Sequence, residues 1–126
     1  MALRILLVED DPWLVHEVRH ALGVAFPSAG CDLAARPTIA GAWAWLHTNP
    51  APTVIVIDQF LAGGDRGETL AAQLQADPQR CTIPRIAYSQ LPMHNAEAFT
   101  YALLKQPVHE ALCQQIQRFL RLHTAR

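Results

Sequence analysis

Two apolar segments of the sequence end abruptly in acidic residues. The first reads ILLVEDD, at residues 5–11, and the second reads VIVID, at residues 54–58. Ligands of open parallel sheets gather at the carboxyl ends of the strands, so two such strands side by side would bring these acids to one edge. Carboxylate oxygens are the ligands that Mg²⁺ prefers, and an acidic site of this kind suits phosphoryl transfer. The acids concerned are Glu9, Asp10, Asp11 and Asp58.

Strand and helix patterns alternate along the rest of the chain. Strands are predicted at residues 4–8, 31–35, 53–57, 83–88 and 101–104. The first predicted helix begins at Pro12, with Asp11 as its N-cap, and the second follows a capping Thr38. A third, of about ten residues, follows the glycine-rich turn at 62–67, and the last runs from Val108 to Leu122. Strands separated by helices predict a parallel sheet with helices on both faces.

The composition of the chain argues against several classes of protein. A chain of 126 residues with 51% hydrophobic content has the size of one domain. Its net charge is −1 and it has no Lys/Arg cluster, which argues against nucleic-acid binding by this chain alone. Its three cysteines lack any CxxC spacing, as expected of a reduced, cytoplasmic protein. No apolar run reaches the length of a membrane span, and the N-terminus has no signal-peptide pattern.

The sequence resembles the receiver domains of two-component response regulators. The resemblance is carried by ILLVEDDPWL at residues 5–14, by VIVIDQF at 54–60, and by the approach to the fourth strand from Asp77-Pro78 to Ile83-Pro84. It implies a single receiver domain over residues 1–126. The implied fold is the flavodoxin-like three-layer α/β fold, with a five-stranded parallel sheet of order 2-1-3-4-5.

The resemblance also implies the parts of a site. Asp58 would accept the phosphoryl group, Ser89 would bond it, and Lys105 would neutralise its charge. Phosphoryl transfer spreads negative charge over three oxygens, so a cation and a hydroxyl donor are the groups that this chemistry needs. Mg²⁺ would be held by three carboxylates and one backbone carbonyl, those of Glu9, Asp10, Asp58 and Phe60 respectively.

The predicted function is to accept a phosphoryl group on Asp58 from a histidine kinase or phosphotransfer protein and to signal to a downstream effector. Such a domain is not an enzyme beyond its own phosphorylation and dephosphorylation. The sequence leaves open the cognate kinase, the output, a homodimeric state, and whether the chain stands alone or was cut from a larger regulator. The alternative is a degenerate receiver, a phosphorylation-independent interaction or dimerisation module.

The segment between the fourth and fifth strands departs from the receiver pattern. Only fifteen residues separate Ser89 from Lys105, and Pro92 lies near the start of them. The helix usual here is therefore expected to be short or missing, with residues 90–100 mobile or irregular, and partners are expected on the first or last helix. Receivers usually follow the lysine directly with proline, but here Gln106 intervenes, which raises the question of a one-residue register shift that would turn Lys105 to the opposite face.

Three other interpretations of the sequence are disfavoured. Residues His16 to His20 match the HExxH pattern of zinc proteases, but the core stripe of that helix centres on Leu14 and Val18, so we expect both histidines in solvent and no zinc. A haloacid-dehalogenase-like phosphatase would carry a second aspartate at position 60, which is Phe60 here. A flavodoxin is disfavoured because acids at the strand ends would repel the phosphate of a flavin.

Overall fold

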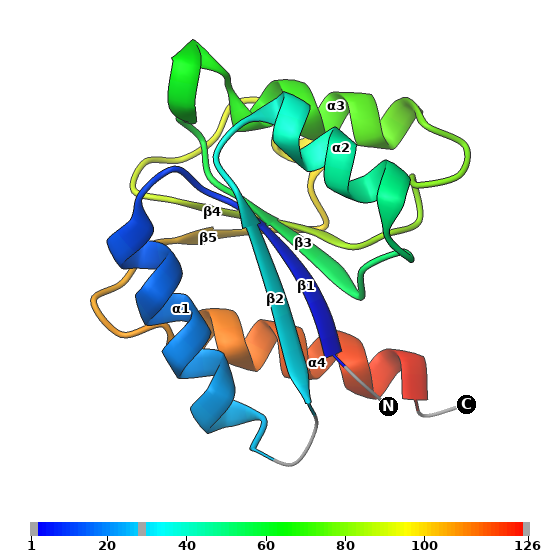
Figure 1. The fold of residues 1–126 in the computed structure, drawn as a ribbon. Helices are drawn as coiled ribbons and strands as arrows, with labels where there is room; N and C mark the ends of the chain where they lie inside the picture. The colour runs from blue at the N-terminus through cyan, green and yellow to red at the C-terminus, as the bar shows by residue number, and fades with distance from the viewer. Residues whose placement is uncertain (1–2, 28–29, 125–126) are drawn as a thin grey trace.

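Five strands form one parallel sheet in the computed structural model, which describes residues 3–27 and 30–124. The strand order is β2-β1-β3-β4-β5, as predicted (Figure 1). The strands are β1 (Leu3–Val8), β2 (Cys31–Arg36), β3 (Val54–Ile57), β4 (Arg85–Ser89) and β5 (Tyr101–Leu104). The helices are α1 (Pro12–Ala25), α2 (Ile39–Thr48), α3 (Gly67–Ala76) and α4 (Glu110–Thr124), with short 3₁₀ turns η1 (Ala62–Gly64) and η2 (Ala96–Ala98).

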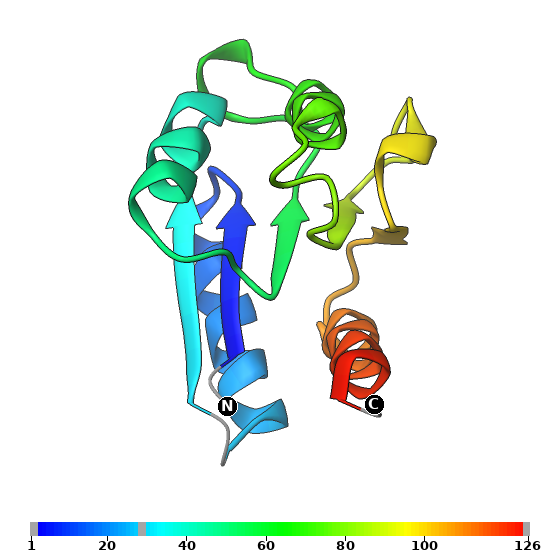
Figure 2. The same ribbon diagram turned by 90° about the vertical axis from the view of Figure 1, so that its right-hand side faces the viewer.

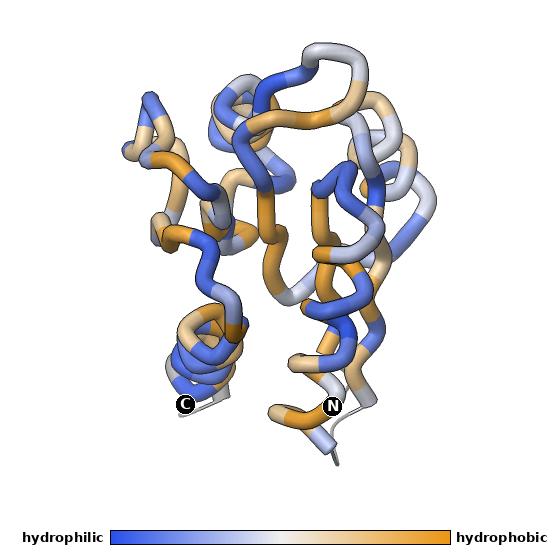
Figure 3. The backbone as a smooth tube through the Cα atoms, turned by 90° about the vertical axis from the view of Figure 1, so that its left-hand side faces the viewer, coloured by the Kyte–Doolittle hydropathy of each residue, from blue (hydrophilic) through white to orange (hydrophobic). Residues whose placement is uncertain are grey.

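Helices cover both faces of the sheet, with α2 and α3 on one side and α1 and α4 on the other (Figures 1 and 2). The central strands β1 and β3 are apolar at every position except Arg4, near the start of β1, because both of their faces are buried. Alternate residues of β1 enter the two cores: Leu6 and Val8 pack toward α2 and α3, and Ile5 and Leu7 pack toward α1 and α4. The hydropathy of the backbone follows this arrangement, with apolar segments concentrated in the sheet (Figure 3). Within the described ranges, no helix is long and apolar enough to span a membrane.

Helix α1 begins where the sequence predicts. The Asp11 side chain accepts a hydrogen bond from the N–H of Trp13 at 3.0 Å, and Pro12 occupies the first helical position. The buried face consists of Leu14, Val18 and Leu22. His16 and His20 lie on the exposed side, as expected from the stripe.

The segment between β4 and β5 contains one 3₁₀ turn and no α-helix, which confirms the prediction of an irregular region. It is nevertheless packed, because Ala98 and Phe99 are buried in the core. The buried guanidinium of Arg85 donates hydrogen bonds to the carbonyls of Ala98, Cys81 and Ile83, at 2.8, 3.1 and 3.1 Å. The bond to Ala98 ties the segment to β4 without a helix, and the N–H of Thr100 adds a bond to the carbonyl of Arg85 at 2.7 Å. Its mobility remains a prediction.

Two elements begin two residues later than predicted. Strand β4 begins at Arg85 rather than Ile83, because the N–H of Ile83 closes a turn onto the carbonyl of Arg80 even though its side chain is buried. Helix α4 begins at Glu110 rather than Val108, whose side chain is exposed. In both places the apolar pattern extends beyond the regular backbone, since an apolar side chain, whether buried like Ile83 or exposed like Val108, does not require a strand or helix.

The three tryptophans differ in burial. Trp45 is buried in the core, while Trp43 is half-buried and its indole N–H donates to Gln73 Oε1 at 2.7 Å. Trp13 is 77% exposed at the start of α1. Trp13 is the most exposed of the three, but a single exposed apolar side chain does not by itself mark an interaction surface.

Candidate functional site

The pairing of β1 with β3 brings the acidic strand ends together. The two strands are parallel with Val8 opposite Ile57, so Glu9 and Asp58 leave the sheet side by side. The N–H of Asp58 donates to the carbonyl of Val8 at 3.0 Å. One carboxylate oxygen from each of Glu9, Asp10 and Asp58 lies within 4.8 Å of the others. Three of the four acids predicted to meet at this edge therefore do so, while the side chain of Asp11 caps α1.

These carboxylates line a pocket of about 260 Å³ at the carboxyl edge of the sheet. Three further segments complete it: Lys105 follows β5, Ser89 ends β4, and Phe60 follows β3. Residues Gln90 and Leu91 also line it. Every residue predicted for the site thus lines this one pocket, although the carbonyl of Phe60 as a metal ligand remains a prediction.

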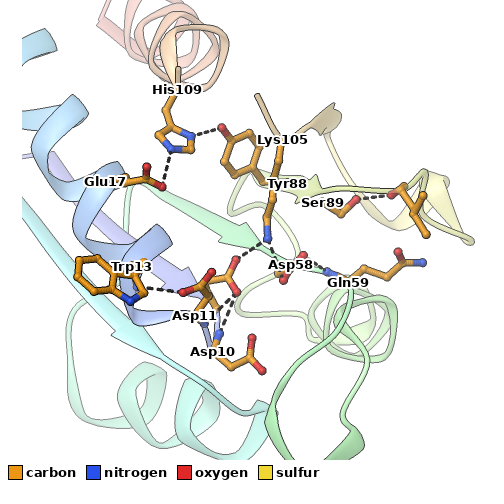
Figure 4. A network of polar contacts seen from close by, with 12 residues as sticks. Asp10, Asp11, Trp13, Glu17, Asp58, Gln59, Tyr88, Ser89, Lys105 and His109 are labelled. Carbon is orange, nitrogen blue, oxygen red and sulfur yellow. Dashed lines mark hydrogen bonds and ion pairs between the residues drawn. The ribbon is translucent and has the colours of Figure 1, made fainter. Parts of the chain in front are cut away.

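Lys105 bridges two of the carboxylates. Its Nζ lies 2.8 Å from Glu9 Oε1 and 3.1 Å from Asp58 Oδ2 (Figure 4). The backbone N–H of Lys105 donates to the carbonyl of Ser89 at 2.8 Å, which continues the register of β5 on β4. The register shift considered from the sequence does not occur, because the extra residue Gln106 lies after the lysine, in the loop to α4. Lys105 is also the only lysine of the chain, a signal that the sequence already contained.

The electrostatics of the pocket are dominated by buried carboxylates. Burial raises the pKa of Glu9 to about 7, against a hydrogen bond from Lys105, and the nearby charge of Asp58 adds to the rise. Glu9 Oε2 also accepts the backbone N–H groups of Asp10 and Asp11, at 3.0 and 3.2 Å. Burial alone would lower the pKa of Lys105, but its contacts with Glu9 and Asp58 outweigh burial and raise it. With three carboxylates against one ammonium, the pocket favours a further cation.

A divalent cation should therefore bind in a pH-dependent way. Below pH 7 the carboxyl of Glu9 holds a proton that the metal must displace, since its pKa is raised to about 7. We expect the affinity for Mn²⁺ to fall up to about tenfold per pH unit below 7 and to level off above it. Calorimetric titration at pH 6 and pH 8 measures the difference, and Glu9→Gln should remove most of it. Equal dissociation constants at both pH values would contradict the assignment of the proton to Glu9.

Ser89 lines the pocket but does not point into it. Its hydroxyl donates to the carbonyl of Leu91 at 2.5 Å, on the side away from Asp58 (Figure 4). To bond a group on Asp58, this hydroxyl would have to leave the carbonyl of Leu91 and rotate. Ser89 therefore lies beside the site, but its hydroxyl bonds to Leu91 and not to the acidic cluster.

Gln59 is a site residue that the sequence reasoning missed. Its backbone N–H donates to Asp58 Oδ1 at 2.7 Å and so limits the rotation of that carboxylate. Its buried side chain donates to Glu68 Oε2 at 3.3 Å, and the same oxygen accepts the N–H of His94 at 3.3 Å. Asp58 is thereby connected to α3 and to the irregular segment. The available signal was a polar residue immediately following a buried strand.

Comparisons with known proteins place this geometry among solved structures. No family model and no curated protein sequence matches the chain. The phosphorylated cyanobacterial phytochrome response regulator RcpA matches with a TM-score of 0.80 at 18% identity, over 97% of this chain and 94% of its own. The receiver domain of a signal transduction histidine kinase from Syntrophus aciditrophicus matches with a TM-score of 0.81 at 22% identity, over 98% and 93%.

A manganese-bound response regulator matches with a TM-score of 0.68 at 20% identity, over 94% of this chain and 91% of its own. All three matches cover nearly the whole of both chains. The chain therefore has the flavodoxin-like fold of response regulator receiver domains.

Proposed function

We propose that the chain is a receiver domain that accepts a phosphoryl group on Asp58 in two-component signalling. The observation that carries the proposal is the cluster of Glu9, Asp10 and Asp58, with ligand oxygens within 4.8 Å, bridged by Lys105 at the carboxyl edge of a receiver-type sheet. The similar protein RcpA is described as phosphorylated, which agrees with this chemistry.

The residues of the chain supply most of what the transfer needs. A carboxylate oxygen of Asp58 attacks phosphorus, the bond from phosphorus to the donor's imidazole nitrogen breaks, and an acyl phosphate forms while the imidazole takes up a proton. The N–H of Gln59 fixes the orientation of the attacking carboxylate through its 2.7 Å hydrogen bond. Lys105, already 3.1 Å from Asp58, neutralises charge on the transferred oxygens.

The donor set fits Mg²⁺, which prefers oxygen ligands and tolerates few carboxylates. Glu9, Asp10 and Asp58 would hold the ion, together with the backbone carbonyl of Phe60. When bound, Mg²⁺ supplies positive charge against the phosphoryl oxygens. One similar response regulator is described in a manganese-bound form, and a divalent cation of this size suits the same ligands.

The partners proposed are a histidine kinase or phosphotransfer protein as donor and an effector protein downstream. Similar structures include the receiver domain of a histidine kinase and a sensor protein, which supports a place in such a pathway. We propose that effectors bind at α1 or α4, because the segment between β4 and β5 has no helix to present. The chain would act in the cytoplasm as a phosphoacceptor and not as an enzyme with a separate substrate.

A second candidate is a receiver that works without phosphorylation. Two observations favour it: the irregular segment in place of a helix, and the Ser89 hydroxyl bound to Leu91 rather than facing Asp58. Such a module would bind its partner equally well in the presence and absence of a phosphodonor.

Labelling with a small phosphodonor separates these functions. In acetyl phosphate and Mg²⁺, we expect intact mass to show one added phosphoryl group on the wild type and none on Asp58→Asn, since the nucleophile is gone. Asp10→Asn should lower the labelling rate by about tenfold or more through weaker metal binding. An unlabelled wild type at saturating donor would favour the phosphorylation-independent module.

The lifetime of the phosphorylated form should depend on Phe60. Phe60 lines the pocket, and the guanidinium carbon of Arg66 lies 4.7 Å from the centroid of its ring. We propose that this ring hinders water from reaching Asp58. We expect Phe60→Asn to speed dephosphorylation by about threefold to tenfold because water gains access to the acyl phosphate. The control is Val24→Asn, which removes an exposed apolar side chain away from the pocket. A rate equal to or below that of the wild type would refute the shielding.

A further inference from the structure

A buried tyrosine lies next to the site on the opposite face of the sheet. Tyr88 precedes Ser89 on β4, is 2% exposed, and packs into the core beneath α1 and α4. Its hydroxyl hydrogen-bonds to Nδ1 of His109, which is 5% exposed and lies just before α4 (Figure 4). Neither residue has a role in the chemistry described above.

The direction of this hydrogen bond follows from the two groups. Burial raises the pKa of Tyr88 to about 12, so the phenol keeps its proton, although the backbone N–H of Gln106 faces its oxygen and opposes the rise. The protonated phenol can donate to His109 Nδ1, an arrangement in which the imidazole has its proton on Nε2. That nitrogen faces Glu17 Oε1 on α1 at 3.6 Å. The phenol therefore contacts His109 at the α4 end of the loop, and the backbone N–H of Gln106, nearer its β5 end, acts on the same oxygen.

Apart from these contacts, the middle of the loop between β5 and α4 is not packed against the rest of the molecule. Gln106, Pro107 and Val108 are exposed, and Val108 is 70% so. The backbone of Lys105 is held by its hydrogen bond to the carbonyl of Ser89, but the residue after it is the extra one in this loop. The ammonium must nevertheless stay within 2.8 and 3.1 Å of two carboxylates on other strands. An unpacked loop would allow it to move away.

We propose that Tyr88 and His109 are positioning residues, which brace the loop from residues 105 to 109 so that the ammonium of Lys105 stays between Glu9 and Asp58. Glu17 anchors the outer end of this chain of contacts on α1. The geometric part of the proposal stands on these contacts, and its consequence for phosphorylation rests on the function proposed above.

Lys105 can be observed directly because it is the only lysine. In tag-free protein grown with ¹³C,¹⁵N-lysine, one set of side-chain signals reports its ammonium. We expect Tyr88→Phe to move the Cε and Nζ signals toward those of a free lysine and to speed hydrogen exchange at Nζ. Tyr101→Phe is the matched control, since Tyr101 is exposed on β5 and its ring packs on Phe119.

Labelling rates with acetyl phosphate test the consequence. Tyr88→Phe removes one oxygen from a packed ring, and we expect it to slow labelling of Asp58 by about fivefold, the effect of one lost hydrogen bond. In a Lys105→Ala background the same change should have no further effect, because there is no ammonium left to position. His109→Gln keeps an acceptor for the phenol and should retain more of the rate than His109→Leu.

Two results would overturn the positioning role. One is an unchanged lysine signal in a Tyr88→Phe protein whose melting temperature falls, which would make Tyr88 a packing residue only. The other is an equal slowing by Tyr88→Phe with and without Lys105. If the wild type is not labelled at all while the lysine signal still moves in Tyr88→Phe, the positioning is supported and the proposed function fails.

Discussion

Replacing Gly67 with alanine is expected to destabilise the protein by about 3 kcal/mol or more, through a clash rather than through lost conformational freedom. Gly67 is the buried first residue of α3, and its N–H donates to the carbonyl of Gln59 at 2.8 Å. A Cβ there would lie 1.9 Å from the carbonyl oxygen of Asp58 and 2.8 Å from Cγ2 of Ile57. The nearest atom belongs to the backbone immediately after β3. Either α3 or this end of the strand must therefore move.

Urea unfolding of Gly67→Ala measures this cost, and labelling of Asp58 should fall with it because the displaced carbonyl precedes Gln59. Gly23→Ala is the control: Gly23 lies within α1, and a Cβ there would meet nothing within 4 Å. Alanine is the better helix former, so this control should stabilise by about 0.5–1 kcal/mol. A Gly67→Ala protein as stable as the wild type would show that α3 can shift freely on β3.

Replacing Lys105 with alanine is expected to cost about 3 kcal/mol at pH 8 and clearly less at pH 6, because it leaves two buried carboxylates without their cation. The sign follows from Glu9, whose pKa is raised on folding from 4.5 to about 7. Proton binding to Glu9 therefore favours the folded state. The free energy of unfolding declines as pH rises from 4.5 through about 7, the two pKa values of Glu9. The ammonium of Lys105 opposes this rise in the pKa of Glu9. Without it, the free energy of unfolding falls more steeply with pH.

Denaturant unfolding at the two pH values, with and without Mg²⁺, checks this expectation. Mg²⁺ should restore much of the stability of Lys105→Ala at pH 8 by occupying the same acidic cluster. Arg118→Ala, which removes an exposed cation from α4, is the control and should change little at either pH. A loss for Lys105→Ala that is the same at both pH values and insensitive to Mg²⁺ would contradict the assigned role of the ammonium.

Much of the site could be predicted from local sequence. The apolar runs of β1 and β3 can only be central strands, because both of their faces must be buried. The acids that end these strands then have to meet at one edge, which placed Glu9, Asp10 and Asp58 correctly. A short or missing helix between β4 and β5 was also predictable, since the short spacing and Pro92 leave room for at most a short one.

The remaining features were decided by tertiary structure. Which face Lys105 takes depends on where the extra residue of its loop is accommodated, and local periodicity at an edge strand does not specify this. The approach of Gly67 to Asp58 and the contact of Tyr88 with His109 join segments that are distant in sequence, so they exist only once helices pack on the sheet. Local sequence therefore determined which groups reach the site, because an apolar run that is buried on both faces ends at the carboxyl edge of the parallel sheet. Packing between distant segments determined how those groups are held.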